Sequence, residues 1–76
     1  MFLVMQDNCT VISSDCLCKI FVKDCSIYAD VGANYLYVLA KFSTDVEAQA
    51  EFDNILGAIA HPAQYPIYRV GGSNNG

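Results

Sequence analysis

The chain has 76 residues, of which 54% are hydrophobic and 16% are charged, and its net charge is −4. A chain of this length forms one small domain that buries about 60–65% of its unfolded surface, and its apolar content excludes disorder for the body of the chain. Only four basic residues are present to neutralise phosphates, so the charge argues against nucleic acids and anionic membranes as partners.

The N-terminal residues 1–5 are apolar but contain no basic residue, and the polar residues 6–8 end this run. A signal sequence needs a basic start and a longer apolar core, and a membrane helix needs about 18–20 apolar residues. We therefore expect a cytoplasmic protein with reduced thiols, without a membrane segment and without a cofactor.

The first two strands are expected at residues 2–6 and 9–12. Both segments are apolar or β-branched, and Asp7 and Asn8 between them supply side chains that favour a turn. Residues 13–15 then interrupt the pattern, because serine and aspartate side chains hydrogen-bond to the local backbone.

Two further strands are expected at residues 18–23 and 27–31, joined by a polar turn. Lys19 and Lys23 mark the outer face of the first of these strands, and the apolar residues between them alternate onto the inner face. A glycine and an asparagine after the second strand favour another turn.

Residues 35–42 form the longest expected strand, and both of its faces are apolar. Side chains alternate between the two faces of a strand. The alternate residues expected to face the core are Leu36, Val38, Ala40 and Phe42. Those expected to face outward are Tyr35, Tyr37, Leu39 and Lys41.

A helix is expected at residues 45–60. Thr44 is a suitable N-cap, and Glu47 three residues later completes the pattern of a capping box. Pro62 disfavours helical geometry at the preceding residue, so the helix should end near Ala60. Its apolar face contains Ala48, Phe52, Ile55, Leu56 and Ile59.

Residues 63–70 are expected to form an extended arm, in which Pro66 is compatible with an edge strand. Residues 71–76 are expected to form a flexible tail.

The fold class is therefore α+β: a mainly antiparallel β-meander of four to five strands, with one α-helix packed on one face, within a single domain at residues 1–70. The core should join the strand residues Ile20, Val22, Leu36, Val38 and Phe42 to the helix residues Phe52, Ile55, Leu56 and Ile59. Because a buried charge would disrupt so small a core, Leu56→Asp is expected to unfold the chain.

The side chains expected on the outward side of the strands predict a surface for binding another protein. Tyrosine is enriched at protein interfaces because it buries a large area and keeps a polar tip. The predicted partner-binding residues are Phe21, Tyr28, Tyr35, Tyr37 and Leu39. They predict a non-enzymatic interaction module, either a homo-oligomer or a small inhibitor or accessory protein. Alternatively, residues 65–70 fold back across this face and bury it.

A second candidate surface is the acidic side of the helix. Glu47, Glu51 and Asp53 could dock a basic partner, or they could simply form a solvated helix surface with capping duties.

The four cysteines have a symmetrical spacing, C-x6-C-x-C-x6-C, at Cys9, Cys16, Cys18 and Cys25. Zinc sites usually present their thiolates in two tight turns, and only the central pair is close in sequence. A cysteine-based metal or redox module is therefore an alternative function, beside ordinary buried thiols and disulfides. A cysteine nucleophile would need a base, and His61 is the only histidine, so we expect no enzyme.

The order of strands followed by one capped helix resembles a group of very short, uncharacterised bacterial and phage proteins. The likeness covers about residues 2–60 and is carried by the polar turn at residues 6–8 and the acidic helix start at residues 43–48. It implies a small intracellular accessory protein, for example a phage-encoded inhibitor of a host defence system that acts through the acidic helix face. The cysteines and residues 65–70 depart from the pattern, and the resemblance supplies no functional residues.

Overall fold

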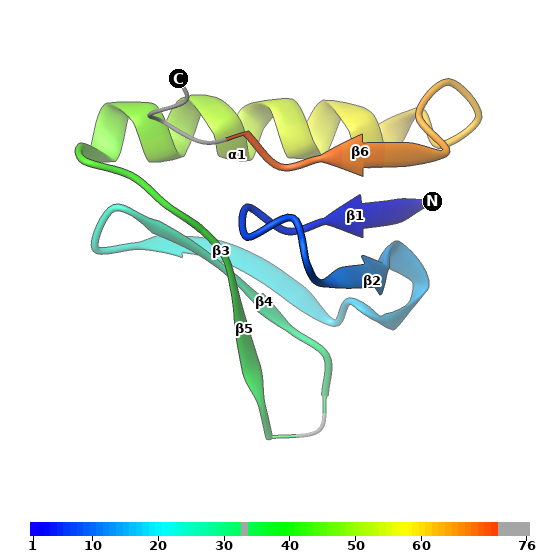
Figure 1. The fold of residues 1–76 in the computed structure, drawn as a ribbon, viewed down its shortest axis with the longest axis horizontal. Coiled ribbons are helices and arrows are strands. Elements are labelled where there is room, and N and C mark those ends of the chain that lie inside the picture. Colours follow the sequence, from blue (N-terminus) through cyan, green and yellow to red (C-terminus); the bar gives the residue numbers. More distant parts are fainter. Residues whose placement is uncertain (33, 72–76) are drawn as a thin grey trace.

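The computed structural model describes residues 1–32 and 34–71, and its fold is α+β, as the sequence predicts (Figure 1). One helix is combined with two three-stranded sheets, whereas a single meander was expected. The elements are β1 (Phe2–Val4), β2 (Val11–Ser13), a 3-10 turn (Ser14–Cys16), β3 (Lys19–Lys23), β4 (Ser26–Asp30), β5 (Leu36–Lys41), α1 (Asp45–Ala60) and β6 (Ile67–Arg69).

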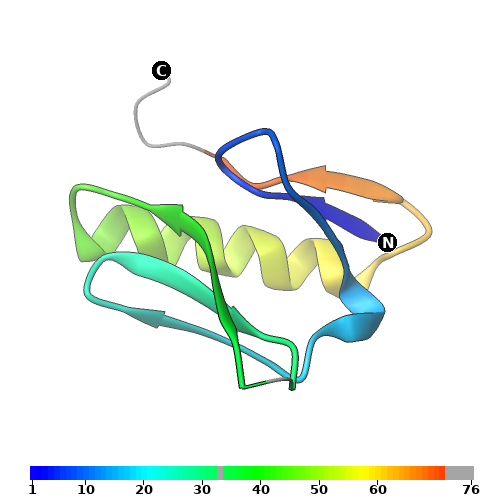
Figure 2. The same ribbon diagram turned by 60° about the horizontal axis from the view of Figure 1, so that its bottom comes forward.

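The helix runs along the angle between the two sheets. Figure 2 shows α1 with the β3–β4–β5 sheet on one side and the strands β1 and β6 on the other. The helix contacts β3 and β4 directly. In the described residues, no helix combines the length and the apolar character that crossing a lipid bilayer requires.

The first sheet has the strand order β2–β1–β6. Strand β1 pairs antiparallel with β2 and parallel with β6, so that Leu3 lies between Ile12 and Tyr68. Of the predicted arm at residues 63–70, only Ile67–Arg69 is a strand, and it forms a sheet edge, where the preceding Pro66 is tolerated. The expected N-terminal hairpin is therefore completed by a C-terminal strand. Of the predicted flexible tail at residues 71–76, all but Gly71 lies outside the described residues.

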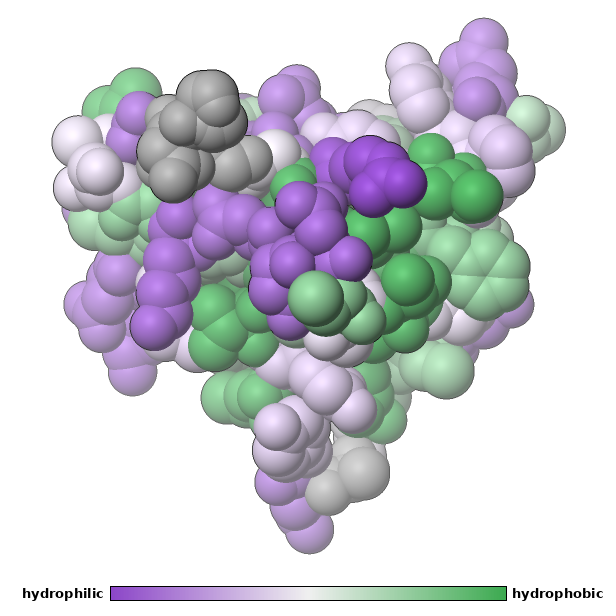
Figure 3. All heavy atoms as spheres, in the orientation of Figure 1, coloured by the Kyte–Doolittle hydropathy of each residue, from purple (hydrophilic) through white to green (hydrophobic). Residues whose placement is uncertain are grey.

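The side of this first sheet that is turned away from the core carries exposed apolar residues. Phe2, Val11 and Ile67 are 51%, 56% and 61% exposed, and Phe2 and Ile67 are register partners. Figure 3 shows hydrophobic residues gathered over β1, β2 and β6, next to hydrophilic ones.

The turn between β1 and β2 is held by Asp7. Its Oδ1 accepts hydrogen bonds from the backbone N–H of Cys9 (2.8 Å) and of Thr10 (3.0 Å), and Asn8 has a positive φ of 59°. The bond from Cys9 is the largest of the effects that lower the pKa of Asp7. A carboxylate that accepts backbone N–H groups is the usual basis of such turns.

The second sheet is the antiparallel meander β3–β4–β5. Asp24 and Cys25 join β3 to β4 with φ angles of 52° and 63°, the geometry of a two-residue hairpin turn. Between β4 and β5 the register shifts, since Tyr28 pairs with Val38 whereas the adjacent Ile27 pairs with Ala40. Leu39 is thus the extra residue of a β-bulge. Before the bulge the odd-numbered residue Tyr37 faces the core, and after it the even-numbered residue Ala40 does.

Local signals account for α1, which covers the span that the sequence predicts. The Thr44 hydroxyl accepts a hydrogen bond from the Glu47 N–H (3.2 Å), and the Glu47 carboxylate accepts one from the Ser43 N–H (3.2 Å). After the helix, the His61 N–H closes the last turn on the Ala58 carbonyl (3.1 Å). The capping pattern and Pro62 therefore fix the two ends of this helix.

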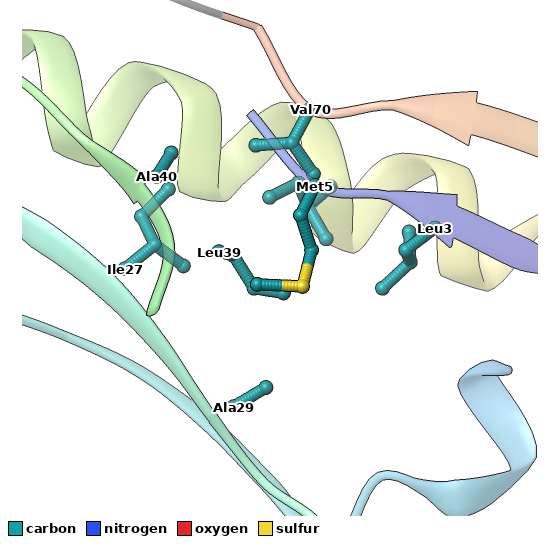
Figure 4. Packing of buried hydrophobic residues seen from close by; sticks show 8 residues of the cluster. Leu3, Met5, Ile27, Ala29, Leu39, Ala40 and Val70 are labelled. Carbon is teal, nitrogen blue, oxygen red and sulfur yellow. The ribbon is translucent and has the colours of Figure 1, made fainter. Parts of the chain in front are cut away.

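The core lies where the two sheets meet the helix. Figure 4 shows the side chains of both sheets converging, with Met5 close to Leu39. The buried cluster consists of Leu3, Met5, Ile27, Ala29, Leu39, Ala40, Ile55 and Val70. Leu3, Ile27, Leu39 and Ile55 are fully buried.

Gln6 connects the two sheets beside the bulge. Its N–H donates to the carbonyl of Leu39, the bulge residue (2.9 Å). Its side-chain amide donates to the Lys41 carbonyl (3.1 Å) and accepts from the Lys41 N–H (2.9 Å). One glutamine therefore pairs with β5 as a neighbouring strand would.

Two residues assigned to the core by the sequence are exposed. Leu36 is 48% exposed because the bulge directs it outward, and Leu56 is 43% exposed because α1 turns Ile55 toward the sheets instead. The expectation that Leu56→Asp unfolds the chain therefore rests on a wrong placement of Leu56.

Candidate functional site

The candidate site is the outer face of the β3–β4–β5 sheet, the side turned away from α1. The registers place its side chains in rows across the three strands. Phe21, Tyr28 and Val38 form the middle row, and Lys19, Asp30 and Leu36 form the row next to it. The third row includes Lys23 and Lys41, which are both exposed. We call these eight residues the outer face.

The middle row is an aromatic stack. The rings of Phe21 and Tyr28 are 5.3 Å apart between centroids with an interplanar angle of 20°, and Lys19 Nζ lies 5.3 Å from the centre of the Phe21 ring. Cross-strand aromatic pairs and cation–π contacts each add a modest stabilisation. They also hold the side chains in one arrangement, as a preformed binding surface requires.

Three of the five predicted partner-binding residues have an outward position. Phe21 and Tyr28 lie together in the middle row, and Tyr35 is 57% exposed just before β5. Tyr35 also contacts Tyr37 edge to face, with centroids 4.7 Å apart.

The predicted placement of the other two is corrected by the structure. Leu39 is fully buried, and Tyr37 is half-buried against the core cluster. The bulge is the reason, because it exchanges the two faces in the first part of β5. Leu36 and Val38, which the sequence placed in the core, lie on the outer face instead.

The alternative in which residues 65–70 cover this face does not describe the fold. The strand within that segment, β6, pairs with β1 in the other sheet, and Tyr68 packs against the core there.

The exposed apolar side of the β2–β1–β6 sheet, with Phe2, Val11 and Ile67, is a surface that the sequence interpretation missed. The only sequence feature that indicates this surface is that residues 1–5 are apolar on both sides of the strand.

The acidic side of α1 is largely engaged within the chain. Glu51 accepts hydrogen bonds from the Tyr68 hydroxyl (2.7 Å) and from the Gly71 N–H (2.9 Å), and so ties α1 to the C-terminal segment. Glu47 caps the helix, and Asp53 accepts a bond from the amide of Gln49 (3.2 Å). All three predicted acidic docking residues therefore accept hydrogen bonds from within the chain.

The bond between Tyr68 and Glu51 predicts a change of stability at alkaline pH. Burial first, and then the bond to Glu51, raise the pKa of Tyr68 well above its ordinary value. An unfolded chain ionises this phenol near pH 10, whereas the folded chain keeps it protonated, so its stabilising contribution is complete below about pH 10 and is lost as the pH rises further. From about pH 9 to about pH 11, the wild type should lose about 1 kcal/mol or less through this group, and Tyr68→Phe should not.

Urea unfolding of both proteins across this pH range measures the difference. Tyr68→Phe should be less stable at neutral pH, because the hydrogen bond to Glu51 is gone. Tyr35→Phe, at a residue that is 57% exposed, is the matched control and should follow the wild type. An equal alkaline loss in wild type and Tyr68→Phe would refute the assignment.

The cysteines do not converge on one point. All four are free; Cys9, Cys16 and Cys18 are exposed and Cys25 is half-buried. Among residues 1–32 and 34–71, no group of three or more histidine, cysteine, aspartate or glutamate side chains is arranged to hold a metal ion. The Cys25 thiol donates to Asp45 (3.3 Å), which raises the pKa of Cys25 and disfavours the thiolate that nucleophilic or metal chemistry needs.

No family model, curated protein or solved structure matches this chain. The resemblance to short bacterial and phage proteins therefore stays a prediction from the sequence pattern. The functional argument depends on the geometry and the charges of the chain itself.

Proposed function

We propose that this chain is a non-enzymatic protein-binding module and that its partner docks on the outer face. The observation that carries the proposal is the row of Phe21, Tyr28 and Val38, which lies in cross-strand register on the side of the sheet away from α1. An aromatic centre bounded by charged residues is the usual composition of a protein interface. Tyrosine at such a centre often contributes much of the binding energy.

The charges of the outer face favour an acidic partner. Lys19, Lys23 and Lys41 are three of the four basic residues in a chain whose net charge is −4, and Asp30 is the one acidic residue among the eight of the outer face. By contrast, α1 has acidic residues in its first turn and no basic residue in its last. The partner that fits is therefore a protein surface with an apolar centre and acidic residues around it.

The same charges weigh against two copies packed face to face. A two-fold contact places the same patch on both sides, so two patches that each carry three lysines and only one carboxylate, Asp30, would meet. Like charges across an interface cost binding energy. We therefore favour a different protein as the partner over the homo-oligomer that the apolar content alone predicts.

The test compares variants at the centre and at the rim of the outer face. Proteins captured on the immobilised chain are purified and titrated by calorimetry at several salt concentrations. Tyr28→Asp should weaken binding by about thirtyfold or more, since losing a central hot-spot residue costs about 2 kcal/mol or more. Lys23→Glu should weaken it several-fold and reduce its salt dependence. Arg69→Glu is the matched control, because it reverses the one basic residue that lies outside the outer face and should leave the affinity unchanged.

Circular dichroism of each variant establishes that it is folded. A captured protein that binds Tyr28→Asp as tightly as the wild type would refute docking on the outer face. A wild-type dimer in light scattering that Tyr28→Asp converts to a monomer would show that the partner is a second copy, contrary to the charge argument.

A further inference from the structure

A hollow of about 350 Å³ lies at the C-terminal end of α1, away from the outer face. It is formed where the last turns of the helix meet the loop that leads into β6, which projects from one end of the molecule in Figure 1. The lining residues that matter here are Asp53, Gly57, His61, Tyr65 and Tyr68.

Two tyrosine rings form a corner in this hollow. The rings of Tyr65 and Tyr68 are nearly perpendicular, with an interplanar angle of 78° and centroids 6.5 Å apart. The Tyr68 ring is held in place by the bond from its hydroxyl to Glu51 (2.7 Å). Perpendicular aromatic faces at such a distance can contact one cation from two sides through cation–π interactions.

Two groups beside this corner are negative, the carbonyl end of α1 and the carboxylate of Asp53. The carbonyl end of a helix carries a partial negative charge, and the last turn of α1 contains no basic residue to offset it. Asp53 lies on the wall of the hollow, and its bond from the neutral Gln49 amide leaves its negative charge in place. An organic cation is therefore favoured over a neutral or anionic ligand.

Gly57 keeps the hollow open. A Cβ atom at this position would meet nothing within 4 Å, although glycine within a helix is unfavourable relative to alanine. Larger side chains would thus fit sterically on the helix but would occupy the hollow.

We propose that this hollow binds a methylated ammonium group. Such a group is large, weakly hydrated and positively charged, and it is recognised by aromatic faces with a nearby carboxylate. The group can belong to a free quaternary amine or to a methylated lysine side chain, and the two sources share the same chemistry at the site.

The first experiment is a titration with tetramethylammonium chloride, followed by the NMR signals of residues around the hollow. Saturable shifts confined to residues near Gly57 and Tyr65 are expected. Potassium chloride controls for ionic strength, and tert-butanol controls for shape without charge. Saturation by tert-butanol at the same concentration would overturn the proposal, since the hollow would then be merely apolar, and so would the absence of saturable shifts with tetramethylammonium.

Variants then locate the binding site. Gly57→Leu should abolish binding while the chain stays folded, with a melting temperature no lower than that of the wild type. Ala50→Leu, two turns earlier on an exposed part of the same helix, is the matched control and should bind as the wild type does. Tyr65→Ala should weaken binding by about tenfold and Asp53→Asn by about threefold. Undiminished binding by folded Gly57→Leu would refute this location.

The source of the ammonium group is decided by parallel titrations. Choline represents a free amine, and short peptides with trimethyl-lysine or unmodified lysine represent a protein ligand. A preference for choline over the trimethyl-lysine peptide identifies the small molecule, and the reverse preference identifies a protein side chain. Unmodified lysine should bind more weakly than either, because its ammonium is more strongly hydrated; equal binding would contradict recognition by the aromatic corner.

Discussion

Leu39→Asp is expected to unfold the protein, whereas Val38→Asp should leave it folded. Leu39 is fully buried in the cluster between the sheets, so aspartate there would place an unpaired charge in the core, at a cost of about 4 kcal/mol or more. That cost is comparable with the total stability of a domain of this size. Val38 lies on the outer face, where aspartate remains hydrated and should cost less than about 2 kcal/mol.

Circular dichroism and urea unfolding of the two variants measure this difference. Leu39→Met, which conserves the volume and the apolar character of the side chain, is the control and should lose less than about 1.5 kcal/mol. The strict alternation read from the sequence gives the opposite ranking of Leu39 and Val38. Unfolding by Val38→Asp together with a folded Leu39→Asp would show that β5 contains no bulge at this place.

The bulge also explains which part of β5 the sequence could predict. Ala40 and Phe42, C-terminal to the bulge, were assigned to the core and do pack there. Leu36 and Val38, N-terminal to it, were assigned to the core but face outward. An extra residue in one strand depends on its neighbour in the sheet and on Gln6, whose N–H bonds to the Leu39 carbonyl. Neither is visible in the alternation of β5 itself.

Elements with local signals were predictable. The ends of α1 follow from Thr44, Glu47 and Pro62, all within the helix or next to it. Similarly, Phe21 and Tyr28 could be placed on one face because a two-residue turn fixes the register of β3 and β4. The parallel pairing of β1 with β6 joins the two ends of the chain, and no local pattern specifies such a contact. For this reason the division into two separate sheets could not be predicted from the sequence.

Ile55→Ala should lower the free energy of unfolding by about 2–5 kcal/mol, the range for truncating a fully buried isoleucine. Ile55 is 0% exposed and belongs to the buried cluster, at the place where α1 meets both sheets. Leu56→Ala should cost only about 1 kcal/mol, because Leu56 is 43% exposed and little of its area is removed from water. In a domain of this size, 1 kcal/mol shifts the melting temperature by about 4–8 °C, so thermal unfolding separates the two variants clearly.

The contrast between these adjacent residues tests how α1 is turned about its axis. Successive residues of a helix point about 100° apart, so the apolar periodicity of α1 accommodates either Ile55 or Leu56 at the centre of the buried face. The sheets decide between them, because Ile55 belongs to the same buried cluster as Leu3, Ile27 and Leu39, whereas Leu56 is 43% exposed. A larger loss of stability in Leu56→Ala than in Ile55→Ala would mean that α1 is turned by about one residue from this arrangement. The core would then be centred on Leu56, as the helical periodicity alone allows.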